Sequence, residues 1–219
     1  MRETSAILAV LWDMDGTLID SETYWMAAER QLAEDYLGTW SGDLGRRLVG
    51  LNLFDAAKIL RSEFAIADLN DQQIIDRMTS IVAAKLAQSI PWRPGVVELM
   101  AELDACGIRS AVVTGSMGRM ASLVAGAMPS GSFEVVIAGD DVEHGKPHPE
   151  PYLRALDALQ LRADQCIAIE DSPTGMASAT SAGLRVLGVT NLVPLSEIGA
   201  ARVISTLERL TVKDLESLW

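Results

Sequence analysis

Residues 7–17 of the chain read Ile-Leu-Ala-Val-Leu-Trp-Asp-Met-Asp-Gly-Thr. The apolar part of this stretch is continuous rather than alternating, which predicts a strand buried on both faces, as in a parallel sheet covered by helices. It ends in Asp13 and Asp15, and Gly16 lets the backbone turn sharply beside them. Carboxylates at the C-terminal end of a parallel strand face the crevice where open α/β sheets bind ligands. Taken alone, however, Asp-x-Asp-Gly also matches calcium loops and ordinary solvated turns.

Similar short apolar runs recur along the chain, and we expect each to be a strand. They lie at 110–113, 133–137, 166–169 and 186–189. The segments between them show helical spacing of apolar residues: one ends before Gly107, a C-cap candidate, and another follows Pro149. This alternation predicts an α/β fold, a doubly wound parallel sheet with a Rossmann-like core.

One interval breaks the alternation, because roughly seventy residues without a strand signal separate the first two strands, which is too long for a loop. Apolar residues at helical spacing recur in it, and we expect an inserted all-helical cap domain over residues 20–88. Residues 1–19 and 89–219 would then form the α/β core. The two segments that connect the cap to the core are candidate hinges. We expect the cap to close over bound substrate by rotation about them.

Composition restricts the partners. The 219 residues are 49% hydrophobic and 22% charged, which is typical of a globular protein. A net charge of -12 disfavours binding to nucleic acid or to anionic membranes. The only N-terminal apolar run, 6–12, is too short for a membrane span or a signal peptide, so we expect a cytoplasmic protein. Cys106 and Cys166 form no CxxC motif and are each interpreted as small buried hydrophobes.

The later strands also end in groups that a phosphate site would use. Thr114-Gly115-Ser116 offers hydroxyl and backbone donors to phosphate oxygens, although a helix N-cap explains it equally well. Lys146 lies between a Gly and a Pro, after a run of acidic residues, and would neutralise the charge of a phosphoryl group. Considered in isolation, the same lysine would be interpreted as an exposed surface residue. Glu170-Asp171 precedes Ser172-Pro173, which could merely cap a helix.

Taken together and in this order, the four motifs resemble the haloacid dehalogenase superfamily. Asp13-Met14-Asp15-Gly16-Thr17-Leu18-Ile19-Asp20-Ser21-Glu22, Gly145-Lys146-Pro147-His148-Pro149 and Glu170-Asp171-Ser172-Pro173-Thr174-Gly175 are similar to the branch that contains β-phosphoglucomutase and small sugar-phosphate phosphatases. The resemblance extends from the first strand to Val189. That superfamily also places a helical cap after its first motif.

The resemblance implies a mechanism. Asp13 would attack phosphorus to form an aspartyl phosphate, and Asp15 would protonate the leaving alkoxide and then deprotonate water. Lys146 and Mg²⁺ would screen the charge that a carboxylate meets on approaching a dianion. Mg²⁺ would be held by Asp13, the Asp15 carbonyl and Asp171, with Glu170 outside the direct ligands or bound through water. Thr114, Gly115, Ser116 and Lys146 would bind the phosphoryl oxygens.

Two questions stay open at this level. Repulsion within the acidic cluster raises the pKa of Asp15, whereas the metal and Lys146 lower it. The substrate depends on the cap, where the β-phosphoglucomutase pattern has an arginine and a histidine at the positions that match Leu53 and Trp25 of this chain. The loss of both polar groups favours a phosphatase over a mutase.

The cap also supplies candidate substrate contacts, which are Glu22, Trp25, Arg47, Gly50 and Asn52. Arg46 and Arg47 could hold a phosphate, although a solvated basic turn is the favoured interpretation. Trp25 and Trp40 could line a sugar pocket, although burial in a helical core is favoured. We therefore expect a Mg²⁺-dependent phosphatase acting on a small phosphomonoester, with a phosphomutase as the alternative. A receiver-like phosphoacceptor is less favoured, because its acidic pair would be adjacent and it would lack the insertion. The oligomeric state is open, with a monomer favoured.

Overall fold

The computed structural model describes residues 7–49, 51–128, 132–195 and 201–217. The chain forms two compact units, one of residues 1–20 and 92–219 and the other of residues 21–91. The boundaries expected from the sequence, after residues 19 and 88, lie one and three residues from these.

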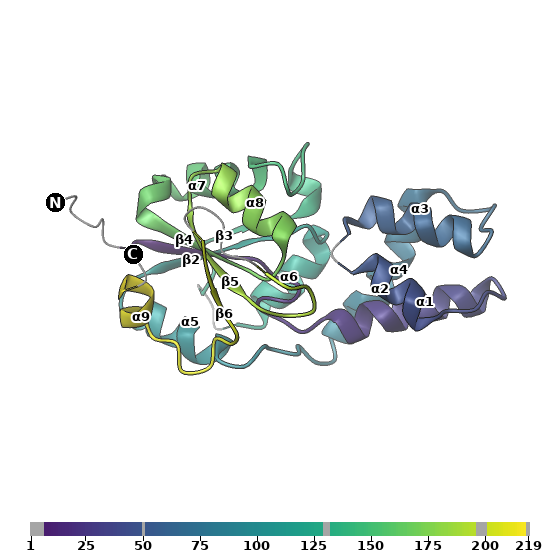
Figure 1. Cartoon of the computed structure of the whole chain (residues 1–219), viewed down its shortest axis with the longest axis horizontal. Helices are drawn as coiled ribbons and strands as arrows, with labels where there is room; N and C mark the ends of the chain where they lie inside the picture. The colour runs from purple at the N-terminus through teal and green to yellow at the C-terminus, as the bar shows by residue number, and fades with distance from the viewer. Residues whose placement is uncertain (1–6, 50, 129–131, 196–200, 218–219) are drawn as a thin grey trace. The chain divides into compact units, whose positions relative to one another are not determined.

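The first unit is an α/β layer structure, as predicted (Figure 1). Its strands form one six-stranded parallel sheet in the order β3-β2-β1-β4-β5-β6. The strands are β1 (Ala9–Trp12), β2 (Arg109–Val113), β3 (Val135–Ile137), β4 (Cys166–Glu170), β5 (Arg185–Val189) and β6 (Ala201–Ile204). The central position of β1 explains its continuous apolar sequence, because both of its edges are paired and both of its faces are covered.

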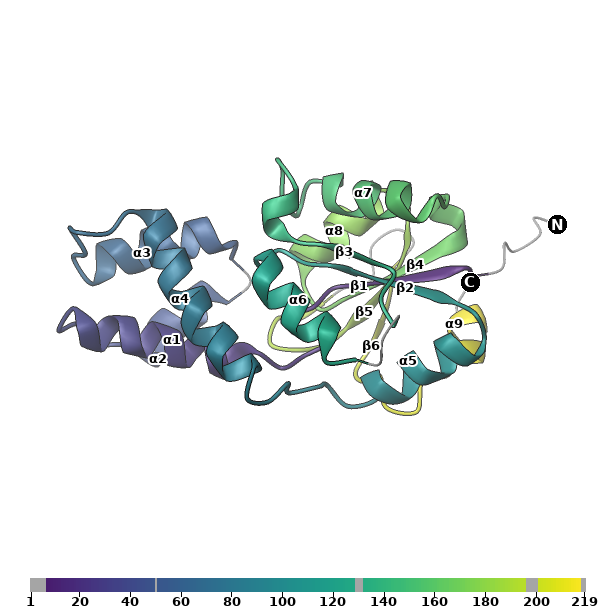
Figure 2. The same cartoon turned by 180° about the vertical axis from the view of Figure 1, so that it is seen from behind.

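Helices cover both faces of this sheet (Figures 1 and 2). They are α5 (Val96–Ala105), α6 (Gly118–Gly126), α7 (Glu150–Leu159), α8 (Pro173–Ser181) and α9 (Val212–Ser217), with short 3-10 turns at η1 (Gly139–Asp141) and η2 (Ala163–Gln165). Helices α7 and α8 pack on the face that carries Leu11, Val113 and Ala168. On the opposite face Trp12 donates a hydrogen bond to Ser110, which contacts Met100 of α5.

The second unit is entirely helical over its described residues. It contains α1 (Glu22–Asp35), α2 (Gly42–Leu48), α3 (Leu53–Glu63) and α4 (Asp71–Leu86), and α4 packs against α1 and α3. Side-chain caps fix the helix starts: Asn70 and Gln73 form a reciprocal capping box at α4, and Asn52 caps α3. The helical spacing of apolar residues predicted α1, α3 and α4, whereas the short helix α2 was not predicted.

Several details differ from the sequence-based expectations. The strands expected to begin at residues 7 and 133 begin at Ala9 and Val135, where pairing with neighbouring strands starts. The edge strand β6 was not predicted. Cys166 is buried as expected, but Cys106 is exposed, because it lies at the C-terminal end of α5 rather than on its apolar face. Along α1, Trp25 is only half-buried and Tyr36 lies just beyond the helix.

Candidate active site

Lys146 is the centre of a buried ion-pair cluster at the carboxyl ends of the strands. Its Nζ donates to Asp13 Oδ1 at 2.7 Å, to Glu170 Oε1 at 2.6 Å and to the carbonyl of Val113 at 2.8 Å. Asp13 directly follows β1, while Val113 and Glu170 end the neighbouring strands β2 and β4. Because adjacent parallel strands end at one edge of the sheet, these groups meet although they are far apart in sequence. The side chain of Lys146 is only 10% exposed, so it is not an ordinary surface lysine.

Three carboxylates gather at this point. Oxygens of Asp13, Glu170 and Asp171 lie within 4.8 Å of one another, which is the separation of groups that could share a cation. Burial raises the pKa of Asp171 to about 8, and repulsion from Asp13 adds to this. Burial likewise raises the pKa of Glu170 although Lys146 opposes it. Burial alone would lower the pKa of Lys146, but Asp13 and Glu170 outweigh it and raise that pKa. The cluster thus combines three acidic side chains with one lysine.

One oxygen of the cluster has no hydrogen-bond partner among the described residues. Asp13 Oδ2 is buried, yet only the other oxygen of that carboxylate is bound by Lys146. An unpaired buried carboxylate oxygen is unfavourable unless it meets a cation or reacts with a ligand. The residues present thus fit a hard divalent cation, for which carboxylate oxygens are suitable ligands.

The segment that follows β2 binds the side chain of Asp15. Ser116 Oγ donates to Asp15 Oδ2 at 2.6 Å, and the Ser116 amide donates to Thr114 Oγ1 at 3.0 Å. Thr114 and Ser116 are both buried. The sequence placed Ser116 among the phosphate-binding groups, whereas in the structure its hydroxyl is engaged by Asp15. At Gly115 an added Cβ would meet no atom within 4 Å, so this backbone is open on that side.

The turn after Asp15 requires glycine for two reasons. Gly16 has φ +87°, in the left-handed region that side chains disfavour. A Cβ at this position would also lie 1.9 Å from Asp171 Oδ2. Arg93 stabilises the turn, because its guanidinium donates to the carbonyls of Gly16 at 2.6 Å and Thr190 at 3.1 Å.

Three residues near the site were missed by the sequence analysis. Tyr152 Oη donates to Glu170 Oε1 at 2.5 Å, and its ring lies 5.2 Å from Lys146 Nζ. Asn191 donates to Asp171 Oδ2 at 3.0 Å, and Arg93 supports the turn described above. Asn191 follows β5, so its place after a strand was a usable signal. Tyr152 was interpreted only as part of an apolar helix face, and nothing in the sequence marks Arg93.

Two of the candidate substrate contacts of the helical unit, Arg47 and Asn52, have side-chain partners inside that unit. Arg47 pairs with Glu63 at 3.4 Å, and Asn52 caps α3 by accepting from Asp55 at 2.9 Å. Glu22 and Trp25, in the first turn of α1, are half-buried. Gly50 lies outside the described residues. Arg46 forms an ion pair with Asp43.

Across the described ranges, no helix combines the length and the apolar character that crossing a bilayer would require.

Comparisons with known proteins identify relatives of this chain. A family model described as haloacid dehalogenase-like hydrolase matches residues 10–189. A phosphorylated carbohydrates phosphatase of Thermotoga maritima is 32% identical over 210 residues, which cover 93% of this chain and 97% of that protein. Hexitol phosphatase B of Escherichia coli (strain K12) is 28% identical over 228 residues, covering 98% and 99%. A mutant of CbbY from Rhodobacter sphaeroides, crystallised with xylulose-(1,5)bisphosphate, superposes with a TM-score of 0.83 at 28% identity, over 95% of this chain and 99% of that chain.

Proposed function

The chain belongs to the haloacid dehalogenase-like hydrolase family, and we propose that it is a phosphatase that hydrolyses a sugar or polyol phosphate through an aspartyl phosphate on Asp13. The observation that carries this proposal is the position of Asp13. One of its oxygens is fixed by Lys146, and the other is buried without a hydrogen-bond partner in the part of the chain that the structure describes. A carboxylate oxygen free to attack, next to a buried cation, is what nucleophilic phosphoryl transfer requires.

The reaction would proceed in two displacements. An Asp13 oxygen attacks phosphorus, the bond to the substrate oxygen breaks, and Asp15 donates its proton to that leaving oxygen. Asp15 then takes a proton from water, the water oxygen attacks the same phosphorus, and the bond to Asp13 breaks to release inorganic phosphate. The hydrogen bond from Ser116 fixes the orientation of Asp15 for both proton transfers.

The acidic cluster fits Mg²⁺, with Asp13, Asp171 and the backbone carbonyl of Asp15 as oxygen ligands. When bound, the ion would offset the charge of the phosphoryl group. Glu170 is placed to orient Lys146 rather than to bind the ion itself, because Lys146 and Tyr152 both donate to one of its oxygens. Thr114 and the Gly115 amide remain the candidates for holding the phosphoryl oxygens.

Hydrolysis is favoured over mutase chemistry by the helical unit. A mutase must hold a second phosphate, yet Arg46 and Arg47 each form an ion pair within that unit. Leu53 and Trp25 supply no charge at the positions where the resemblance suggests it.

The test measures phosphate release from hexitol phosphates and p-nitrophenyl phosphate with Mg²⁺. We expect the parent chain to turn over these substrates and Asp13→Asn to lower kcat by at least about a thousandfold. The control is Asp157→Asn at an exposed position of α7, and it should leave kcat unchanged. Undiminished turnover in Asp13→Asn would exclude the proposed nucleophile. Turnover of β-glucose phosphates only with a bisphosphate activator, with no phosphate released, would show a mutase instead.

A further inference from the structure

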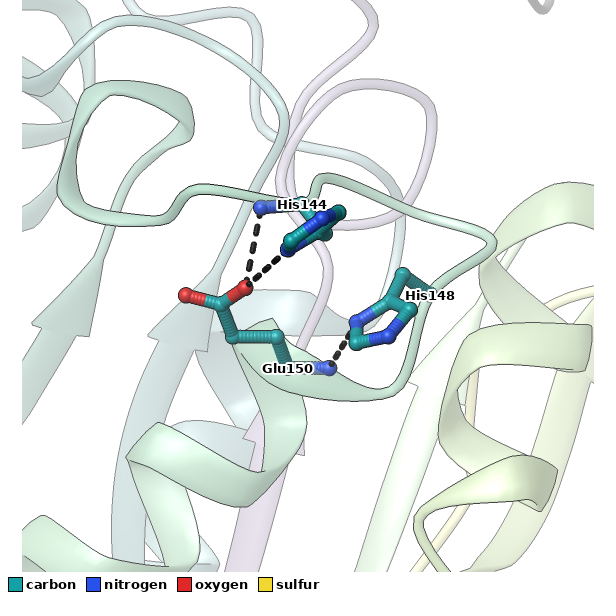
Figure 3. Close-up of side chains that lie close together, drawn as sticks. All are labelled: His144, His148 and Glu150. Carbon is teal, nitrogen blue, oxygen red and sulfur yellow. Dashed lines mark hydrogen bonds and ion pairs between the residues drawn. The ribbon is translucent and has the colours of Figure 1, made fainter.

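The segment that carries Lys146 also holds the only two histidines of the chain. His144 and His148 are exposed on either side of Lys146, and Glu150 begins α7 just after them. The two imidazole rings are 4.8 Å apart between centroids and tilted by 36°. Figure 3 shows the Glu150 carboxylate facing the His144 ring, with the His148 ring beside the Glu150 backbone nitrogen. Histidine nitrogens and a carboxylate oxygen are therefore grouped on one side of this segment.

Hydrogen bonds hold the Glu150 carboxylate in place. Its Oε1 accepts from the Glu143 amide at 3.0 Å and from Arg154 Nε at 3.0 Å. Its Oε2 accepts from the His144 amide at 2.9 Å. The carboxylate is thus oriented before any ligand arrives, which reduces the entropy lost on binding.

The distances agree with a tetrahedral ion. Zinc bonds to His nitrogen and carboxylate oxygen are about 2.0–2.1 Å, so two ligand atoms on one tetrahedral ion lie about 3.3 Å apart. His144 Nδ1 and Glu150 Oε2 are 3.2 Å apart. Ligand atoms of all three residues lie within 4.8 Å of one another. Rotation of the exposed His148 ring, whose Nδ1 now accepts from the Glu150 amide at 3.2 Å, would close the remaining gap.

We propose that His144, His148 and Glu150 form a surface site for a divalent transition-metal ion of the zinc, nickel and cobalt class. The ion takes the place of the proton between His144 Nδ1 and Glu150 Oε2, and water completes its coordination. Two imidazoles and one carboxylate select such ions over Mg²⁺, which prefers oxygen ligands alone. The Asp13 cluster has the opposite composition, with three carboxylates and no imidazole. The two sites therefore differ in the ions they bind.

Binding at this site would restrain the segment that supplies Lys146. An ion shared by residues 144, 148 and 150 closes a short loop around Lys146, whose Nζ contacts Asp13 and Glu170. A ligand that binds only the folded arrangement stabilises it in proportion to its occupancy. Zinc should therefore raise the thermal midpoint of the parent chain.

The experiment titrates ZnCl2 by calorimetry into untagged protein, because a histidine tag would itself bind the ion. Mg²⁺ is present in large excess to occupy the carboxylate cluster, and Cys106→Ser removes the exposed thiol as a zinc ligand. In this background we expect one zinc ion per chain, with affinity at least about tenfold weaker in His144→Gln/His148→Gln. Glu143→Gln is the matched control, because it removes one charge from the same segment but no proposed ligand.

A second measurement uses the parent protein, so it does not require that any variant folds. Because the chain has only two histidines, a long-range ¹H–¹⁵N spectrum of the parent protein reports on this cluster alone. Zinc should shift the signals of both imidazoles at one equivalent. Equal zinc affinity in the double variant and the control, or imidazole signals unmoved at saturation, would overturn the proposal. Neither readout requires phosphatase activity, so the outcome is independent of the proposed function.

Discussion

Replacing Tyr152 by Phe tests whether the buried cluster depends on a residue that does not itself contact substrate. The Tyr152 hydroxyl donates to Glu170 Oε1 at 2.5 Å, in a position where both side chains are fully buried. Burial and the charge of Glu170 raise the pKa of Tyr152, so the hydroxyl keeps its proton and acts as a donor. The substitution removes this donor but keeps the ring that lies 5.2 Å from Lys146 Nζ.

The size of the effect follows from the charge of the acceptor. Hydrogen bonds to charged groups contribute about 1.5–3 kcal/mol, and no water replaces the hydroxyl in a fully buried position. We therefore expect Tyr152→Phe to lower the free energy of unfolding by about 2 kcal/mol and the melting midpoint by about 4–8 °C. Because Glu170 also orients Lys146, we expect kcat to fall by about tenfold, with a smaller change in KM.

Urea unfolding and Mg²⁺-dependent hydrolysis of p-nitrophenyl phosphate measure the two effects. Tyr24→Phe is the matched control, because the Tyr24 hydroxyl makes a 3.3 Å bond to the Ser89 carbonyl in a more exposed position of the helical unit. That control should change the free energy of unfolding by less than about 1 kcal/mol and leave kcat unchanged. If Tyr152→Phe and Tyr24→Phe gave equal stabilities and equal kcat, the coupling between Tyr152, Glu170 and Lys146 would be refuted.

Three further outcomes are expected. Ser116→Ala removes the 2.6 Å hydrogen bond to Asp15, so it should lower kcat by ~10- to 100-fold and change KM little in steady-state assays. An unchanged kcat would show that this hydrogen bond does not position Asp15 for proton transfer. Gly175→Ala should lower the free energy of unfolding, measured by urea titration, by ~1–3 kcal/mol, because its Cβ would lie 1.9 Å from Glu170 Oε2. A free energy of unfolding equal to the parent's would show that the start of α8 shifts at little cost. Burial raises the pKa of Glu29 from 4.5 to about 7. The folded chain then holds one more proton than the unfolded chain between these pH values, so stability should fall as pH rises from 4.5 to 7, by at most about 3 kcal/mol. Glu29→Gln should make this slope shallower in urea titrations at several pH values, and the part that remains is expected from Asp171, whose pKa burial also raises. A slope unchanged by Glu29→Gln would contradict the contribution of Glu29.

Much of the site could be predicted from the sequence because its residues follow the carboxyl ends of parallel strands. Asp13 and Glu170 follow or end buried apolar runs, and parallel strands bring such positions to one edge of a sheet. The proximity of Asp13 to Glu170 follows from the pairing of β1 with β4, whereas Lys146 reaches both of them from the segment after β3. The helical unit was predictable for a similar reason, since spacing and caps such as Asn70 act locally.

Residues that act across the sheet were beyond this reasoning. Tyr152 lies on the face of α7 that packs against the sheet, and only the packing angle of that helix brings its hydroxyl to Glu170. Arg93 reaches Gly16 and Thr190 from a segment far away in the sequence. Contacts of this kind depend on three-dimensional packing, which no periodicity encodes.

The role assigned to Ser116 shows why residue type alone is an incomplete guide to chemistry. A buried hydroxyl after a strand suits a phosphate ligand or an N-cap, and the sequence offers no means of choosing a carboxylate as its partner. In the structure the Asp15 carboxylate accepts from Ser116, while Thr114 accepts from the Ser116 amide. In the proposed reaction the end of β2 would therefore have two tasks: Ser116 would fix the group that moves protons, and Thr114 and Gly115 would bind the phosphoryl oxygens beside it. Positioning the proton donor and the phosphate from one strand end would keep them in register as substrate binds, because no hinge separates them.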